Sequence, residues 1–350
     1  MQRSKLAEIY AARFASVPLV AECIFLNPAF LDRTLKREVC DLLLVLRNQA
    51  VVVQMKSQDK ERRDEKLNRW IRKETKNAAS QIKGAIRTLR EHPLWCEHPR
   101  RGHVEFEAGY LKAVQCLVIV ETQLSVAIPT DLPEVCDGVP ISYLSLNDFL
   151  NLINELRAFP EIVRYLAQRA AFSEIAQIPL GGERSLYARY LANEGGFGDC
   201  RSYDEILQSL RELSIGDLFR GKQASDLPAE IVEHFVDSLA ERITHWDEGL
   251  TPEQVRGFDD SEARSNYLRI QEEFCDLHLC DRRAVGRQLS ELRSMIDNSK
   301  SEDMAYASAR FDSKPAMLYV VAAARGIPKG RTAPAMSLSS RRRTGVLRKD

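Results

Sequence analysis

Two neighbouring segments of this 350-residue chain place polar side chains inside apolar runs. Val51 to Val53 lead directly into Gln54, Met55 and Lys56, and the preceding apolar run contains Asp41. On a β-strand, residues two apart point to the same side, so Gln54 and Lys56 project together. Burying an amide and an ammonium group is costly unless they are paired or open to a cleft. Asp41, on a neighbouring strand, is available as the carboxylate partner of these groups.

The elements that position these side chains are predicted from the surrounding pattern. Residues 38–46 and 51–57 are two candidate strands, and the four residues 47–50 between them are short enough for a hairpin. The strands are apolar almost throughout, which predicts burial on both faces of a sheet and helices above and below it.

Further elements surround this hairpin. Residues 5–26, including Glu22, read as helical, and Asn27-Pro28 is expected to end that segment. Residues 65–90 have the three-and-four spacing of one long amphipathic helix. Residues 115–128 supply one or two further strands.

Charge is distributed unevenly along a chain whose 50 basic and 50 acidic residues balance. The segment 56–90 holds 12 basic against 5 acidic residues, and 325–350 holds 8 against 1. Such blocks are candidate footprints for a polyanion, although a basic helix face is often only a solvated surface.

The order of these residues resembles the PD-(D/E)XK nuclease superfamily, in its Mrr and Holliday-junction-resolvase-like branch, as a variant with Gln-x-Lys. The resemblance covers roughly residues 5–128 and implies a restriction-endonuclease-like mixed sheet flanked by helices. It also implies a Mg²⁺ site, for which Mn²⁺ could substitute. In this superfamily an acidic residue on the second core strand binds the metal, and the pair on the third strand completes the site.

Carried onto this chain, the resemblance gives Asp41, Gln54 and Lys56 catalytic roles. Asp41 is the main metal ligand, Gln54 contributes its side-chain carbonyl and Met55 its backbone carbonyl, while Lys56 positions the attacking water. Glu22 is implied as an additional ligand. Gln54 stands where an acid is common, which leaves one negative charge fewer around the metal.

Other interpretations of the same residues remain open. Asp41 and Lys56 could form only a buried ion pair, and Glu22 could be an exposed helix position. Glu38 is expected to be a strand-edge charge, because on a regular strand it faces the side opposite to Asp41. Gln81 could line the site or the surface.

Lys83 and Arg87 follow Gln81 along the predicted basic helix. They are candidates for contact with nucleic-acid phosphates, and are equally explained as solvated charges.

The predicted organisation is an α/β nuclease domain over 1–145, a mainly α-helical region over 146–325 and a basic disordered tail over 326–350. Within the helical region, patterns at 146–172, interrupted by Pro160, and at 203–214, 228–246, 260–297 and 303–325 favour helices. The region would engage a partner or substrate.

The sequence therefore favours a Mg²⁺-dependent endonuclease acting on DNA rather than RNA, by architectural analogy an effector of bacterial defence against phage or plasmids. The alternative is a non-catalytic nucleic-acid-binding or assembly subunit on a nuclease-like scaffold. A protein partner and a homo- or hetero-oligomer are expected. No apolar stretch approaches the roughly 20 residues of a membrane-spanning helix, so a cytoplasmic location without membrane partners is expected.

Overall fold

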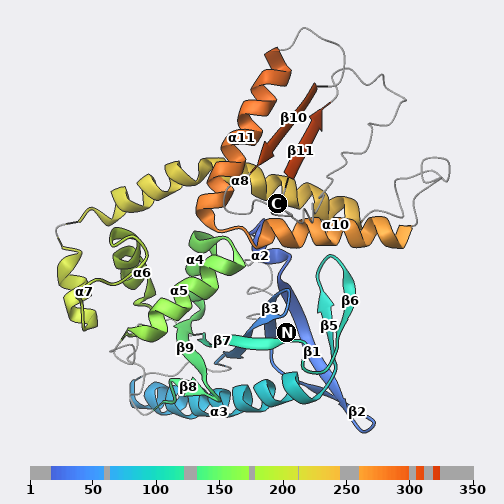
Figure 1. Ribbon diagram of the computed structural model, residues 1–350. Coiled ribbons are helices and arrows are strands. Elements are labelled where there is room, and N and C mark those ends of the chain that lie inside the picture. The colour runs from blue at the N-terminus through green and yellow to red at the C-terminus, as the bar shows by residue number, and fades with distance from the viewer. Residues whose placement is uncertain are drawn as a thin grey trace, which may run out of the picture. The chain divides into compact units, whose positions relative to one another are not determined.

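The computed structural model describes residues 17–58, 64–121, 132–172, 178–211, 213–244, 260–298, 305–310 and 318–323. They form an α/β structure with a mixed, open sheet flanked by helices and a helical C-terminal part (Figure 1). The chain divides into two compact units. The first comprises residues 1–222 and 236–276, and the second comprises 223–235 and 277–350.

The sheet of the first unit has the strand order β6-β5-β1-β3-β4-β7-β9-β8, with β2 also paired to β1. Neighbours β4, β7 and β9 are parallel, and the other pairs are antiparallel. The strands are β1 Ile24–Asp32, β2 Leu35–Glu38, β3 Leu42–Leu46, β4 Gln49–Lys56, β5 Leu94–His98, β6 Gly102–Phe106, β7 Lys112–Val120, β8 Val135–Cys136 and β9 Val139–Ser145.

The hairpin predicted from the two apolar segments is confirmed. β3 and β4 pair in antiparallel register from Leu42 opposite Val53 to Leu46 opposite Gln49. Every residue of β3 is buried, as the continuous apolar run predicts. Arg47 takes a positive φ of 56° in the two-residue turn, a conformation that tight hairpin turns require.

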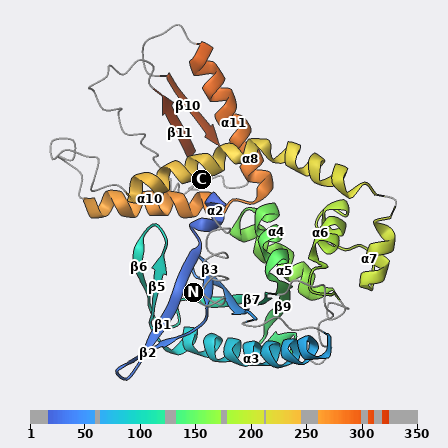
Figure 2. The same cartoon turned by 180° about the vertical axis from the view of Figure 1, so that it is seen from behind.

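Helices cover both faces of this sheet, as Figures 1 and 2 show from opposite sides. The predicted long helix is confirmed as α3, Asp64–Glu91, which contributes Ile82 and Ile86 to a core shared with Leu43 and Val52 of the strands. The other face carries α4, Leu146–Leu156, and α5, Phe159–Ala171. Arg157, with a φ of 60°, ends α4, and Pro160 stands in the first turn of α5, where its missing N–H is not needed.

The N-terminal expectation is wrong where the structure describes it. Instead of a helix extending to Leu26, the short helix α2, Pro18–Ala21, is followed by β1, which continues through Asn27 and Pro28. Asn27 has a φ of 48°, and the register of β1 against β5 shifts between Leu26 and Ala29. The turn signal therefore produces an irregularity within a strand, not its end. Residues 5–16 lie outside the described residues.

Helices dominate the later part of the chain, as the sequence predicts, but their bounds differ. Residues 276–278 interrupt the run predicted over 260–297, and the helix predicted over 228–246 begins already at Ile215. The segment predicted as helical over 303–325 contains the antiparallel strands β10, Ala305–Arg310, and β11, Leu318–Ala323. Tyr319, Val320 and Val321 are residues that favour strands, which here outweighs the helical spacing. The helices are α6 Glu183–Ala192, α7 Tyr203–Ser209, α8 Ile215–Thr244, α10 Asp260–Cys275 and α11 Leu279–Asn298.

The boundary expected at residue 145 does not separate the two compact units. Helices α4 and α5 pack against β7 and β9, so residues 146–172 complete the sheet's own core. The expected tail, 326–350, lies outside the described residues. None of the described helices is both long and apolar enough to cross a bilayer.

Candidate functional site

Asp41 lies at a bulge in the strand that borders β1. This border is formed first by β2 and then by β3, with Ala29 opposite Glu38 and Leu26 opposite Leu42. The shift between these pairs leaves one extra residue on the β2–β3 side, which is the definition of a β-bulge. Bulges re-aim side chains, and this one sets the direction of Asp41.

The side chains of Asp41, Gln54 and Lys56 project to the same face of the sheet. Continued by one pair, the β3–β4 register sets Asp41 opposite Gln54. Asp41 is two residues from Leu43, and Gln54 and Lys56 are two and four residues from Val52. The side chains of Leu43 and Val52 pack against α3, so those of the three polar residues face the same side. The juxtaposition expected from the sequence is therefore present, on the α3 side.

Asp41 contacts the third residue of the expected set through the backbone. Its Oδ2 accepts a hydrogen bond from the Met55 N–H at 2.6 Å. The N–H and C=O of one strand residue point to the same edge, so the Met55 carbonyl faces the edge occupied by Asp41. Because β3 begins only at Leu42, the carboxylate also takes over the role of a ladder acceptor. This hydrogen bond gives Asp41 a structural role that does not depend on any catalytic function.

Lys56 is held by the long helix. Its Nζ donates a hydrogen bond to Gln81 Oε1 of α3 at 2.7 Å. Asp41 and Lys56 are both half-buried. Burial raises the pKa of Asp41, while the Met55 N–H and the positive charge of Lys56 lower it. The two groups thus interact electrostatically, and Gln81 lines the site.

Gln54 has an unsatisfied polar atom. The side chain is buried, and its Oε1 has no hydrogen-bond partner among the described residues. A buried acceptor without a partner is costly and calls for an explanation such as an ion or water. A hard cation is one ligand that would satisfy this oxygen.

Glu38 ends β2 beside this site but faces the other side of the sheet, in line with its expected role as a strand-edge charge. Burial raises the pKa of Glu38, the charge of Asp41 raises it further and that of Lys56 lowers it. Glu38 is exposed and lies opposite Ala29, which in turn lies opposite Trp95. The residues on either side of Trp95 pack in the core on the α3 side, so Glu38 faces away from α3.

A further carboxylate lies at the adjacent strand end. Glu121 follows β7, donates its N–H to the Lys56 carbonyl at 2.8 Å and accepts a hydrogen bond from the Ser57 hydroxyl. In the sequence, Glu121 is the first charged residue after the apolar run 116–120. Because parallel neighbouring strands end at the same edge of a sheet, this position indicates a carboxylate beside the end of β4.

Glu22 lies elsewhere, and its expected place beside Asp41 is wrong. The Val45 N–H donates to the Cys23 carbonyl at 2.7 Å, so Glu22 is level with the end of β3, whereas Asp41 precedes its start. The reason is the antiparallel direction of β1, which the prediction of a helix for this segment could not reveal. Five strand residues therefore separate the level of Glu22 from that of Asp41, which corresponds to roughly 17 Å.

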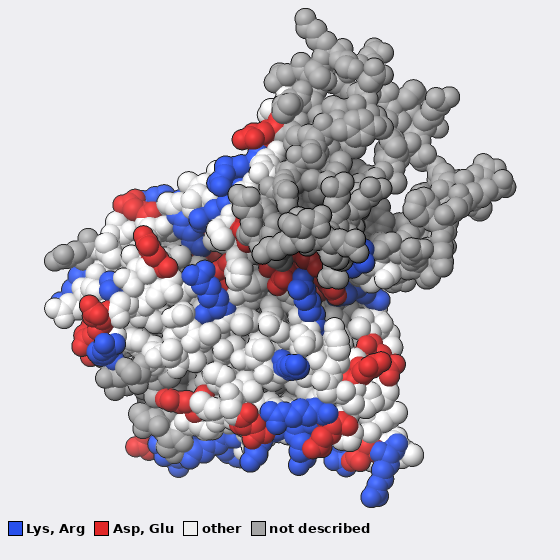
Figure 3. Space-filling view, in the orientation of Figure 1, with Lys and Arg blue, Asp and Glu red and all other residues white. Residues whose placement is uncertain are grey.

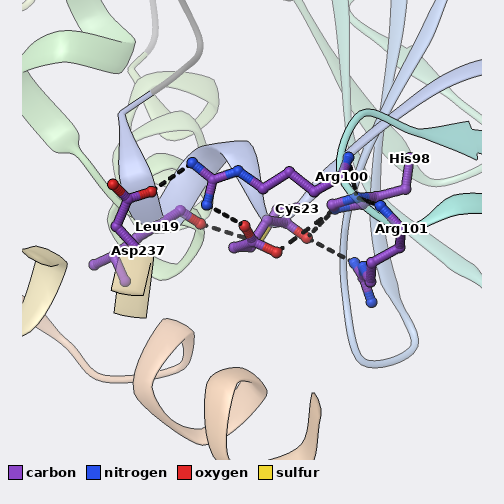
Figure 4. A network of polar contacts seen from close by, with 7 residues as sticks. Leu19, Cys23, His98, Arg100, Arg101 and Asp237 are labelled. Carbon is purple, nitrogen blue, oxygen red and sulfur yellow. Dashed lines mark hydrogen bonds and ion pairs between the residues drawn. The ribbon is translucent and has the colours of Figure 1, made fainter. Parts of the chain in front are cut away.

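The Glu22 carboxylate is part of a structural network instead (Figure 4). Arg100 donates to Glu22 Oε1 at 2.8 Å and also pairs with Asp237 of α8. His98 Nδ1 accepts the N–H groups of Arg100 and Arg101, each at 3.1 Å, which leaves the proton on Nε2, 3.1 Å from the Glu22 carbonyl. Burial and the charge of Arg101 lower the pKa of His98 to about 3. This network fastens α8 to the sheet.

Lys83 and Arg87 are exposed but lie away from Lys56. At about 100° per residue, Lys83 is turned roughly 200° from Gln81 around α3. Burial raises the pKa of Cys136 in β8 and the nearby charge of Lys83 opposes this rise, so Lys83 lies close to β8, three strands from β4. Figure 3 shows the blue side chains along α3 at the lower edge, with red ones between them. The structure therefore does not bring these two bases to the Asp41 site.

Within the described ranges, no three His, Cys, Asp or Glu side chains are grouped as ligands of one metal ion. The oxygen donors of the candidate site are instead the Asp41 carboxylate, the Gln54 amide and the Met55 carbonyl. A comparison of the chain with models of protein families, with curated proteins and with solved structures finds no match.

Proposed function

We propose that this chain is a metal-dependent endonuclease that hydrolyses phosphodiester bonds of DNA, with its site at Asp41, Gln54 and Lys56. One observation carries the proposal: these three side chains project from adjacent strands to one face, and the Gln54 oxygen among them is buried without a partner. The strands β1, β3 and β4 are followed by α3 and the parallel strand β7. This order supports the restriction-endonuclease-like architecture that the sequence resemblance implies.

The donors fit a hard cation such as Mg²⁺ or Mn²⁺. Asp41, Gln54 and the Met55 carbonyl would hold it, with Asp41 as the full negative charge among them. When bound, the ion would supply positive charge to activate water and to stabilise the phosphoryl transition state. Lys56, oriented by Gln81, would donate hydrogen bonds to the attacking water or to a phosphate oxygen.

The test is relaxation of supercoiled plasmid by purified protein in Mg²⁺ or Mn²⁺. Asp41→Asn keeps an acceptor for the Met55 N–H while removing the charge, so we expect cleavage to fall at least ~100-fold in a folded protein. Lys56→Met should have a similar effect. Asp217→Asn, at an exposed carboxylate of α8, is the matched control and should cleave like the wild type.

Equal cleavage by all four proteins would identify a contaminant and reject the enzyme. The second candidate, a nucleic-acid-binding subunit without catalysis, is favoured by the amide at Gln54 and by the position of Glu22 outside the site. Tight DNA binding by a wild-type protein that never cleaves in either metal would support it.

A further inference from the structure

A β-hairpin arm begins at the candidate site. Residues 29–32 of β1 pair with β2, residues 35–38, through a two-residue turn at Arg33-Thr34. All four residues of β2 are exposed. The arm lies at the outer end of the sheet in both Figures 1 and 2.

The arm exposes apolar side chains on both of its faces. Leu31 is 49% and Leu35 64% exposed. Leu31 is opposite Lys36, and Leu35 is opposite Asp32, so the two leucines point to opposite faces. A flat partner surface would cover only one face. A groove would cover both, and the major groove of duplex DNA admits a two-stranded β-ribbon.

The arm also carries basic groups suited to a polyanion. Arg33 stands at the tip and Lys36 on one face, while Arg37 pairs with Asp32 at 2.9 Å on the other. Charged residues on an edge strand also discourage aggregation, which alone would explain the bases. It does not explain the two leucines, because exposed apolar side chains make an edge more prone to association.

The turn holds an arginine where glycine is favoured. Arg33 has a φ of 60°, in the left-handed region that costs most side chains free energy. A guanidinium group is thus kept at the tip despite an unfavourable backbone, as is common for residues that bind ligands.

The base of the arm is the candidate active site. Glu38, opposite Ala29, ends β2, and the bulge bearing Asp41 follows three residues later along the chain. Three residue steps of roughly 3.3 Å carry the arm about 10 Å outward from this base. A duplex held on the arm would therefore have its backbone beside Asp41.

We propose that the β1–β2 hairpin inserts into a groove of duplex DNA, with Leu31 and Leu35 against its walls and Arg33 and Lys36 on its phosphates, and so holds the duplex over the Asp41–Lys56 site. This inference rests on the proposed function for its substrate. Lys83 and Arg87, two exposed basic residues of α3, provide the matched control for the basic residues of the arm.

The experiment measures binding of the full chain to duplex DNA in EDTA, where cleavage cannot occur, over a range of salt concentrations. Arg33→Gly with Lys36→Thr removes two charges while giving the turn its favoured residue. We expect affinity to fall at least about tenfold and the slope of log affinity against log salt to become shallower by about 1.8. Leu31→Thr with Leu35→Thr should weaken binding with the slope unchanged.

Lys83→Gln with Arg87→Gln, the same change of charge on the far flank of α3, should change affinity less than threefold. Wild-type affinity and slope in the arm variants would overturn the proposal, as would a wild type that does not bind duplex DNA. A loss of self-association in the arm variants with DNA binding intact, measured by sedimentation, would reject DNA in favour of a second copy of the chain.

Cleavage in Mg²⁺ separates this proposal from the proposed function. Arm-dependent binding by a protein that never cleaves would retain the arm and reject the nuclease. Cleavage and binding unaffected by the arm substitutions would retain the nuclease and reject the arm.

Discussion

At the scale of single residues, Gln54 would limit how strongly the proposed site binds a cation. An amide oxygen offers a dipole where a carboxylate would offer a full charge, and among the proposed ligands Asp41 is the acid. The charge of Lys56 acts against a cation, as its effect on the pKa of Asp41 indicates. The candidate site is therefore short of negative charge, not of oxygen atoms.

Replacing Gln54 with Glu should supply the missing charge. At a few ångströms this attraction is worth about 1.4 kcal/mol, so the Mg²⁺ concentration for half-maximal cleavage should fall about tenfold. Without metal, Gln54→Glu should melt at a lower temperature, because the carboxylates at positions 41 and 54 would repel each other. Titrations of Mg²⁺ by cleavage and by thermal shift give both quantities.

Gln81→Glu is the matched control, since it adds the same charge beside Lys56 rather than beside Asp41. It should not lower the Mg²⁺ requirement. If Gln54→Glu folds and needs as much Mg²⁺ as the wild type, residue 54 is not a ligand position.

Residue alternation explains which members of the site could be found from the sequence. Gln54 and Lys56 share a face because they are two apart on one strand, and Asp41 joins them because a tight hairpin fixes the register. The contact of Gln81 with Lys56 could not be found in this way, because it depends on the angle at which α3 crosses β4, which leaves no periodic signal.

At the scale of elements, the β5–β6 hairpin is tied to Glu22, two residues before β1, by a histidine that must stay neutral. His98 is buried and its pKa is lowered to about 3, whereas an unfolded histidine titrates near 6.5. Above about pH 6.5 this contact contributes its full stability. As the pH falls from there towards about 3, unfolding takes up a proton and the folded state loses stability.

For one such group, the free energy of unfolding can fall by about 1.4 kcal/mol per pH unit. Urea titrations between pH 6.5 and 4.5 measure this as the slope of the free energy of unfolding against pH. His98→Asn keeps an acceptor near Nδ1 but does not titrate, so its slope should be shallower, although it is less stable at pH 7. His103→Asn, at an exposed position of β6, should retain the wild-type slope. Equal slopes for wild type and His98→Asn would show that His98 does not control acid stability.

The elements differ in how far local sequence determines them. The apolar period of α3 predicts its bounds to within a residue, because one face packs on the sheet along the whole helix. Local spacing predicts a helix at the start of β1. Ile24 and Phe25 instead lie in a strand, because β1 pairs with β3 and β5, which are distant in sequence. Long-range pairing of this kind overrides local spacing.

At the scale of the whole molecule, the division into compact units follows packing and not composition. The change from strands to helices after residue 145 suggested a domain boundary, yet α4 and α5 are needed to cover the sheet. The second unit instead takes residues 223–235 from within α8 and combines them with α11. A helix shared in this way has no composition change along it, so sequence could not mark the division.

The second unit depends on a buried ion pair that offers a test of its independence. Arg282 of α11 donates to Glu233 of α8 at 3.2 Å, and both side chains are at most 3% exposed. Glu233→Gln removes the charge of one partner of this buried ion pair, a change that costs about 3–5 kcal/mol. Hydrogen exchange should therefore accelerate by ~100-fold or more in 223–235 and 279–298, because each 1.4 kcal/mol is about tenfold.

If the two units are stabilised separately, peptides from β3, β4 and α3 should keep their protection in Glu233→Gln, and cleavage at the Asp41 site should continue at the wild-type rate. Glu230→Gln, one turn earlier on α8 and only half-buried, is the matched control and should leave exchange unchanged throughout. Accelerated exchange in β3 and β4 would mean that unit two stabilises the sheet, and that the candidate site depends on a cooperative fold of the whole chain.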